Sequence, residues 1–300
     1  MLVARLWKKV GRMAYNKIRY SFIYQYRNYV PFDGVKENLP RFEEINRNPA
    51  ASQRYAIFFT ARSGSSRLSE ILHRAGLSEP DESFNPDWMS EMAGFFGATN
   101  MPDYINALTR MRNSDGVWGF EITYLQLLLS FRRERDFLDL VNPTDWIWLI
   151  RKDIVAQAVS ISRMIQTNVY HNQGQSAQIL AEAEAKFTYN AWVIRRNLIR
   201  IVLQELLVER MFKRRKLEPL RLSYEQLAGM KPEAIASGIA RFLGRTVSQT
   251  QPIASSHSKI GTAKNDAFAE KFRKHHRVLM LVVGMCRSNL LQRLPDQPFG

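Results

Sequence analysis

The sequence shows its clearest chemistry in a short Gly-, Ser- and Arg-rich segment that follows an apolar run. The run Tyr55–Thr60 (YAIFFT) is typical of a β-strand, and Ala61–Arg67 (ARSGSSR) leads directly into residues with helical spacing. A strand, a tight turn and a helix N-terminus direct several backbone N–H groups and the positive helix end at one spot. The segment therefore predicts a site for phosphate or sulfate. A serine-capped helix after a strand is the purely structural alternative.

The same loop differs from the phosphate-binding loop of kinases and other nucleoside triphosphatases. Those loops follow the pattern G-x-x-x-x-G-K-[ST], in which a lysine precedes a Mg²⁺-binding hydroxyl. No lysine stands at that place in Ala61–Arg67. A phosphoryl transferase that uses ATP and Mg²⁺ is therefore disfavoured, although it remains an alternative that turnover without metal would exclude.

A second candidate anion site follows another apolar run, Asp145–Ile150 (DWIWLI), which predicts a strand. Arg151 stands at the end of this run, and Ser160 lies about two turns into the helix that follows. A guanidinium and a hydroxyl so placed can hold a second phosphate. A solvated base at a strand end is the alternative for Arg151. Further candidates on the same segment are Lys152 and Arg163, with Asp153 as the helix cap.

Apolar runs and helical patterns alternate along the chain, which predicts the α/β class: a parallel β-sheet flanked by helices. Ligands of such sheets bind at the carboxyl ends of the strands, where both candidate anion sites lie. The predicted strands cover residues 55–60, 117–124, 145–150 and 220–223. The predicted helices cover residues 65–76, 124–140, 153–167, 177–214, 235–243 and 266–291.

Residues 1–32 form a basic, aromatic head in which Leu2, Leu6, Val10 and Met13 follow helical spacing. The head contains no Asp or Glu. Its helical spacing predicts an N-terminal helical extension. Such a helix suits an anionic membrane or glycolipid surface; a helix docked on the body and a nucleic-acid contact are the alternatives. Residues 33–53 predict a linker. We therefore expect an extension with linker over 1–53 and one domain over 54–300.

Composition narrows the function classes. The chain has 300 residues and a net charge of +15, so an anionic partner is expected. One cysteine, Cys286, excludes a disulfide within the chain and a thiolate metal cluster. No run approaches the ~20 apolar residues of a membrane span.

We expect a cytoplasmic protein, in peripheral contact with the inner membrane through residues 1–32. The alternative from another class is a non-catalytic binder of anionic membranes or nucleic acid on an α/β scaffold, although zinc-finger spacing and RNA-binding signatures are missing.

Five blocks of the sequence are similar to the sulfotransferases that use 3′-phosphoadenosine 5′-phosphosulfate (PAPS), and within them to the bacterial branch typified by trehalose 2-sulfotransferase. This resemblance implies the sulfotransferase fold, with a P-loop-like sheet. It also implies transfer of a sulfuryl group from PAPS to a hydroxyl of a carbohydrate or glycolipid. The blocks are FFTARSGSSRLSEIL (58–72), SEPDESF (78–84), GVWGFEITY (116–124), WLIRKDIVAQAVSISRMIQTNVY (148–170) and LSYEQL (222–227).

For the donor, the resemblance implies two phosphate subsites and no metal ion. Arg151 and Ser160 match the residues that bind the 3′-phosphate. In the late segment Ser255–Lys264, where sulfotransferases often close over the nucleotide, Lys259 and Lys264 are candidates to reach its phosphates. The loop that matches the 5′-phosphosulfate site consists of Arg62, Ser63, Gly64, Ser65 and Ser66.

For catalysis, Glu82 matches the carboxylate that the branch uses as its base, and we expect it to take the proton of the acceptor hydroxyl. Arg62 is expected to stabilise the charge that develops during transfer. Glu79 matches an acceptor contact. Glu121 stands where members of the family often carry lysine, which places it on the acceptor side; it and His257 are the alternative bases. The segment between Glu82 and Gly116 differs from the trehalose enzyme, so trehalose itself is not the expected acceptor.

Overall fold

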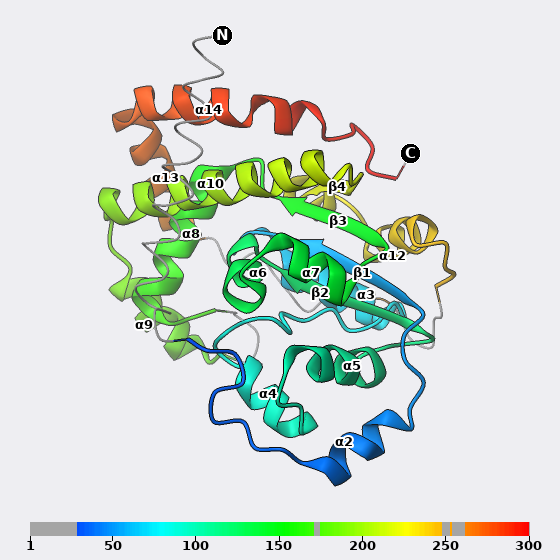
Figure 1. Ribbon diagram of the computed structural model, residues 1–300. Coiled ribbons are helices and arrows are strands. Elements are labelled where there is room, and N and C mark those ends of the chain that lie inside the picture. The colour runs from blue at the N-terminus through cyan, green and yellow to red at the C-terminus, as the bar shows by residue number, and fades with distance from the viewer. Residues whose placement is uncertain (1–28, 171–174, 248–252, 254–261, 300) are drawn as a thin grey trace.

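The computed structural model describes residues 29–170, 175–247, 253 and 262–299. At its centre lies a four-stranded parallel sheet with the strand order β2-β1-β3-β4 (Figure 1). The predicted α/β class with a parallel sheet is confirmed. The strands are β1 (Gln53–Phe58), β2 (Val117–Ile122), β3 (Asp145–Ile150) and β4 (Leu220–Ser223).

The strand order creates one place suited to ligand binding. β1 pairs with β2 on one side, and the chain then crosses over so that β3 pairs on the other side of β1. Tyr55 marks the centre, since it lies opposite Gly119 of β2 and Asp145 of β3. Open α/β sheets bind ligands in the crevice at such a reversal, outside the carboxyl ends of the strands. The loop after β1 and the turn after β3 meet there.

Each strand is buried on both faces, which explains why the strands are apolar runs and not alternating patterns. Ala56 and Phe58 point into one core cluster, with α6 (Tyr124–Phe131) and α7 (Glu134–Val141). Tyr55 and Ile57 point into the other, with α3 (Ser65–Arg74) and α12 (Pro232–Phe242). The sheet is thus held between two helical layers, and its ends keep a constant position relative to both.

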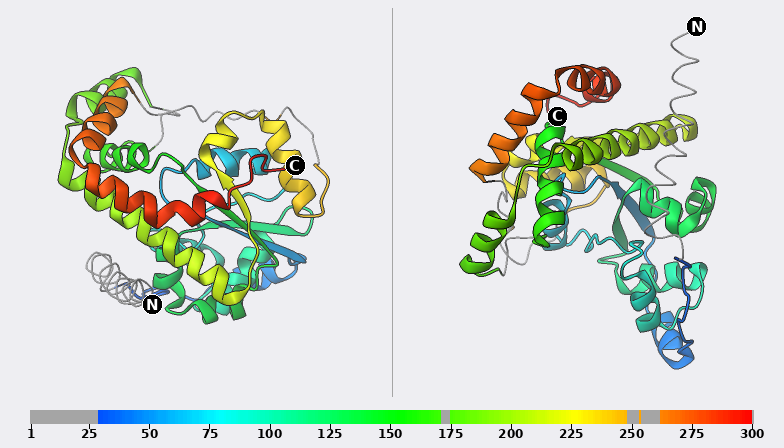
Figure 2. Two further views of the ribbon diagram at one scale, coloured as in Figure 1. Left: turned by 90° about the horizontal axis from the view of Figure 1, so that it is seen from above. Right: turned by 90° about the vertical axis from the view of Figure 1, so that its left-hand side faces the viewer.

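The remaining helices lie around this three-layer body. Figure 1 shows α2, α4 and α5 together at one end of the molecule, whereas α8, α9 and α13 gather on one flank. In both figures α14 runs beside α10 (Figures 1 and 2). Their bounds are α2 (Leu39–Asn46), α4 (Met89–Phe96), α5 (Met101–Met111), α8 (Ile154–Thr167), α9 (Ala177–Lys186), α10 (Ala191–Arg215), α11 (Tyr224–Ala228), α13 (Ala263–His275) and α14 (Arg277–Gln292).

Three long predicted helices are each divided in two. The helix expected over 124–140 breaks at Arg132, whose φ of 60° lies outside the helical region. The helix over 177–214 is interrupted between α9 and α10, where Phe187 is extended and Asn190 caps α10. The helix over 266–291 breaks at His276, between α13 and α14. Apolar spacing continues across each break, so periodicity alone did not reveal them.

The segment 33–53 contains a helix where a linker was predicted. Asn38 caps α2 by accepting a hydrogen bond from the backbone N–H of Arg41, and Ile45 is buried in the core. The predicted helical extension in the head lies outside the described residues, except for its last four positions. Among the described helices, none is long and apolar enough to cross a membrane.

A buried ion pair connects α14 to the sheet edge. Arg287 of α14 is 3% exposed and donates two hydrogen bonds to Glu205 of α10, at 2.7 and 2.9 Å. The same guanidinium donates to the backbone carbonyls of Arg151, at 2.6 Å, and Lys152, at 2.9 Å. The turn that follows β3 is therefore held from outside by a side chain that lies more than a hundred residues further along the sequence.

Candidate active site

Gly64 closes the turn between β1 and α3. Its φ of +88° favours glycine, and a Cβ atom at this position would come within 2.6 Å of the Tyr224 ring. The loop thus needs glycine for its backbone conformation and for its close approach to Tyr224, the first residue of α11. The following helix, α3, starts at Ser65, so its N-terminal N–H groups lie at the turn, as the sequence predicts.

The start of the loop is fixed by a glutamine of α8. Gln157 is fully buried, and its side-chain amide donates to Thr60 Oγ1 at 2.9 Å and to the Ala61 carbonyl at 2.8 Å. A buried amide that bonds backbone and side chain in this way costs more to lose than a surface contact. It joins the loop after β1 to the helix after β3.

Arg62 connects the two predicted phosphate subsites. Its Nε donates to Ser160 Oγ at 3.0 Å, and its Nη1 donates to the Tyr170 carbonyl at 2.6 Å. From the other side, Arg151 donates to the Arg62 carbonyl, and its guanidinium carbon lies 4.7 Å from the centre of the Tyr224 ring. The structure therefore brings together Arg62, Ser160 and Arg151, which the sequence placed in two separate sites.

The electrostatics of this cluster fit an anion. Burial lowers the pKa of Arg62, and the neighbouring charges of Arg151 and Arg163 lower it further. Two buried polar atoms, Ser63 Oγ and Arg151 Nε, have no hydrogen-bond partner among the described residues. Buried polar groups are usually bonded, so such exceptions require an explanation. Glu225 Oε1 lies 4.0 Å from Arg151 Nε and offsets part of this charge. Clustered positive charge beside donors without hydrogen bonds is an environment that a phosphate or sulfate group would stabilise.

The first turn of α11, directly after β4, contributes two residues that sequence reasoning did not select. Tyr224 packs on Gly64 and Arg151, and Glu225 accepts hydrogen bonds from the backbone N–H groups of Lys152, at 2.8 Å, and Asp153, at 3.0 Å. The signal was present in the block LSYEQL, because the residues that follow a fourth parallel strand must lie at the same edge of the sheet. Their roles depend on contacts across the fold, which the spacing did not reveal.

Glu82 lies in the loop between α3 and α4. Its Oε2 accepts hydrogen bonds from the side-chain amides of Gln126 and Asn85, the latter at 3.1 Å. Burial raises the pKa of Glu82, although these two bonds lower it in part. A carboxylate with a raised pKa that is held by two amides is suited to accept a proton near neutral pH.

Glu121 is the most enclosed of the candidate carboxyls. It is 4% exposed, and its Oε1 has no hydrogen-bond partner among the described residues. Burial raises its pKa well above the usual range, the charge of Glu82 raises it further, and a hydrogen bond with Ser65 lowers it in part. Glu121 thus lies between the candidate base and the phosphate loop and favours the protonated form.

Replacing Glu121 by glutamine should make stability less dependent on pH. The pKa of this carboxyl is higher in the folded chain than in the unfolded chain, where it is about 4.3. Its contribution to the free energy of unfolding is therefore full below about pH 4.3 and is lost as pH rises toward the pKa of the folded state. We therefore expect Glu121→Gln to have a higher free energy of unfolding than wild type at pH 8, and little difference near pH 4, in urea titrations. Glu218→Gln, an exposed acid, is the control. A difference in unfolding free energy between Glu121→Gln and wild type that stays constant from about pH 4 to 8 would contradict a raised pKa for Glu121.

The other predicted residues lie in less enclosed positions. Glu79 is exposed and pairs with Arg112 at 3.2 Å, and Arg112 also lies 3.6 Å from Asp81. Ser66 is half-buried in the first turn of α3. Lys264 donates to the Glu184 carbonyl at 2.6 Å, on α9. Lys259 and His257 lie outside the described residues. Within the described ranges, no three His, Cys, Asp or Glu side chains are grouped so as to hold a metal ion.

Comparison with known proteins gives two matches. The model of the Stf0 sulphotransferase family matches residues 54–275. Trehalose 2-sulfotransferase of Mycolicibacterium smegmatis is 25% identical over 214 residues, which cover 58% of this chain and 78% of that enzyme. Residues 54–275 contain the sheet except for Gln53, the loop after β1 and the carboxylates Glu82 and Glu121.

Proposed function

Because the chain belongs to the Stf0 sulphotransferase family, we propose that it transfers a sulfuryl group from PAPS to a hydroxyl of a carbohydrate or glycolipid. Membership of the family makes it a sulfotransferase; the donor, the acceptor class and the base are our proposal. The observation that carries the proposal is the Arg62–Ser160–Arg151 cluster, in which the buried Arg151 Nε has no hydrogen bond among the described residues, and neither has the neighbouring Ser63 Oγ. The name of the mycobacterial relative favours a sugar acceptor.

The residues at the ends of β1 and β3 fit the two phosphates of PAPS. When bound, PAPS supplies a sulfuryl group attached to a phosphate leaving group. The N–H groups of the loop Arg62–Ser66 and the Arg62 guanidinium would hold the 5′ side, and Arg151 with Ser160 the 3′-phosphate. Arg62 bonds Ser160 at 3.0 Å, so one guanidinium connects both subsites. Lys259 and Lys264 remain predicted contacts to the phosphates.

Glu82 is proposed as the general base, with Glu121 as its buried neighbour. The acceptor hydroxyl loses its proton to the Glu82 carboxylate, whose raised pKa brings it closer to neutral pH. Gln126 and Asn85 hold the carboxylate in one orientation. Arg62 and the loop N–H groups stabilise the charge that develops on the transferred group and on the departing phosphate. In this proposal the positive charge of Arg62 stabilises the transferred group, a role that Mg²⁺ has in kinases.

The cellular location of the protein remains a prediction. We propose a cytoplasmic enzyme whose head, residues 1–32, contacts an anionic membrane surface. The +15 net charge of the chain supports this proposal. The proposal agrees with a glycolipid acceptor, because such a substrate would be presented at the same surface.

Transfer can be tested with the purified chain, PAPS, EDTA and a panel of saccharides and alkyl glycosides. We expect sulfated product, detected by mass spectrometry, together with release of 3′-phosphoadenosine 5′-phosphate (PAP) that depends on acceptor. ATP with Mg²⁺ is the parallel donor. Phosphorylated product from ATP, in place of sulfated product from PAPS, would contradict the proposal.

A further inference from the structure

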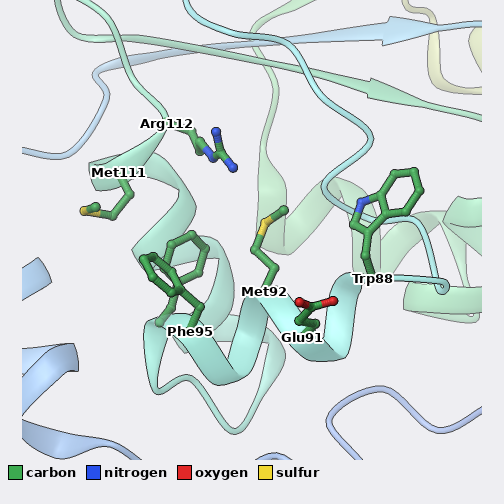
Figure 3. A pocket seen from close by; sticks show the side chains of 7 residues that line it. Trp88, Glu91, Met92, Phe95, Met111 and Arg112 are labelled. Atoms are coloured by element: carbon green, nitrogen blue, oxygen red, sulfur yellow. The ribbon is translucent and has the colours of Figure 1, made fainter. Parts of the chain in front are cut away.

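An open pocket of about 500 Å³ lies beside the loop that carries Glu82. Figure 3 shows side chains of α4 on one side of it, with Arg112 and Met111 facing them from the end of α5. Its volume falls in the range of small-molecule sites, ~300–1,000 Å³. The residues that line it are Trp88, Glu91, Met92, Phe95, Phe96, Met111 and Arg112.

The lining is unusually apolar for a surface that remains accessible. Phe95 is 62% exposed and Trp88 is 39% exposed, although large aromatic side chains normally avoid water. Exposed apolar side chains that gather around a hollow mark a binding site more often than a bare surface. Met92 and Met111 add flexible thioether walls, which adapt to ligands of variable shape.

Two charged side chains line the pocket, Arg112 and the exposed Glu91, and Arg112 already has acidic partners. Arg112 pairs with Glu79 at 3.2 Å and lies 3.6 Å from Asp81, so its charge is largely offset. A pyranose ring needs several hydrogen bonds to replace those it makes with water. A chain of methylenes needs none and gains from every buried carbon. The lining therefore favours a hydrocarbon chain over a second sugar.

The pocket is joined to the candidate base. The indole N–H of Trp88 donates to the Glu82 carbonyl at 3.1 Å, and Arg112, on the opposite wall, holds Asp81 next to Glu82 in the chain. A ligand chain in the pocket thus lies beside the residues that position the Glu82 loop. This region lies between Glu82 and Gly116, where we expect from the sequence a difference from the trehalose enzyme.

We propose that this pocket is the subsite for the alkyl or acyl chain of an amphiphilic glycoside, whose sugar hydroxyl is presented to Glu82. The inference rests on the proposed sulfuryl transfer, and it narrows the acceptor class from carbohydrates in general to glycolipids. The chain adds binding through burial of apolar surface, and the loop 79–82 aligns the sugar.

Calorimetric titration with octyl β-D-glucopyranoside, below its micelle concentration, and with glucose tests the subsite. We expect the octyl glycoside to bind at least tenfold more tightly than glucose, and Phe95→Ser to weaken it about tenfold. The matched control is Trp192→Ser on α10, because Trp192 is 56% exposed and its ring is capped by Arg196 at 5.2 Å, as Arg41 caps Phe95 at 5.1 Å. We expect the control to bind like wild type.

Three results would overturn the inference: equal affinity for glucose and the octyl glycoside, no effect of Phe95→Ser, or equal weakening by Trp192→Ser. A further arm repeats the titration with saturating PAP. The octyl glycoside should still bind, since the pocket and the phosphate loop are separate; competition would also overturn the inference. These titrations measure binding and need no sulfuryl transfer. Failure of the octyl glycoside to bind would therefore overturn only the pocket assignment, whereas failure of PAP to bind would overturn the proposed function.

Discussion

Replacing Glu82, the proposed general base, by glutamine should lower the rate of sulfuryl transfer by about 10²- to 10⁴-fold, the usual cost of losing such a base. The amide keeps the size of the side chain and can still contact Gln126 and Asn85, but it cannot accept the acceptor's proton. PAP affinity should remain close to wild type, because Glu82 contacts neither Arg62 nor Arg151. The transfer assay with PAPS measures the rate, and calorimetry measures the affinity for PAP.

Two controls separate this role from a general loss of structure. Glu43→Gln changes an exposed acid on α2 and should retain full turnover. The pH profile of wild type should show activity that falls as pH drops through the pKa of Glu82, which burial raises from its ordinary value. Full turnover in Glu82→Gln would contradict the assignment of Glu82 as the base and would leave Glu121 or His257 as the candidates.

Arg287→Met should lower the free energy of unfolding by about 3 to 5 kcal/mol, the range found when one member of a buried ion pair is removed. Glu205 is 1% exposed and would be left charged and unpaired in the core between α10 and α14. The carbonyls of Arg151 and Lys152 would lose their donor as well. Urea unfolding followed by circular dichroism measures the loss.

The matched control for this variant lies six residues further along the chain. Arg293→Met removes a half-exposed partner of Glu209 and should cost no more than about 1 kcal/mol. The double variant Arg287→Met with Glu205→Leu should regain most of the stability, because the stranded charge is gone. Its affinity for PAP should be lower than that of wild type, because the carbonyls of Arg151 and Lys152 still lack their donor and, of Arg287 and Glu225, only Glu225 still holds this turn. Equal losses in Arg287→Met and Arg293→Met would contradict this account.

The strands could be predicted because burial on both faces leaves a local signature. The bounds of β3 and β4 agree with the predicted runs, and those of β1 and β2 differ by two residues at one or both ends. Helix breaks left no such signature, since Arg132 and His276 interrupt stretches whose apolar spacing continues. α4 and α5 were not predicted. The apolar residues of α4 serve both the core and the open pocket, so they form no single buried face. α5 has a clear buried face, with Tyr104, Ile105 and Leu108 in the core, and its spacing could have been recognised.

The phosphate loop was recognisable because its chemistry is contiguous, from Arg62 to Ser66. Joining it to Arg151 and Ser160 required only that parallel strands end at one edge of the sheet. The roles of Tyr224 and Glu225 were not recognisable, because each depends on a contact across more than sixty residues of chain. The burial of Glu121 and the support of Glu82 by Gln126 likewise follow from packing and not from spacing.

The most direct test of the central claim is calorimetric titration of the purified chain with PAP, beside ATP with Mg²⁺. A PAPS-dependent sulfotransferase must bind the spent donor at the loop after β1. We predict that PAP binds more tightly than ATP with Mg²⁺, and that Arg62→Ala and Ser160→Ala each weaken PAP by roughly 10- to 100-fold, as expected for the loss of a bond to a charged group. No binding of PAP to folded protein, or binding that both variants leave unchanged, would contradict the claim.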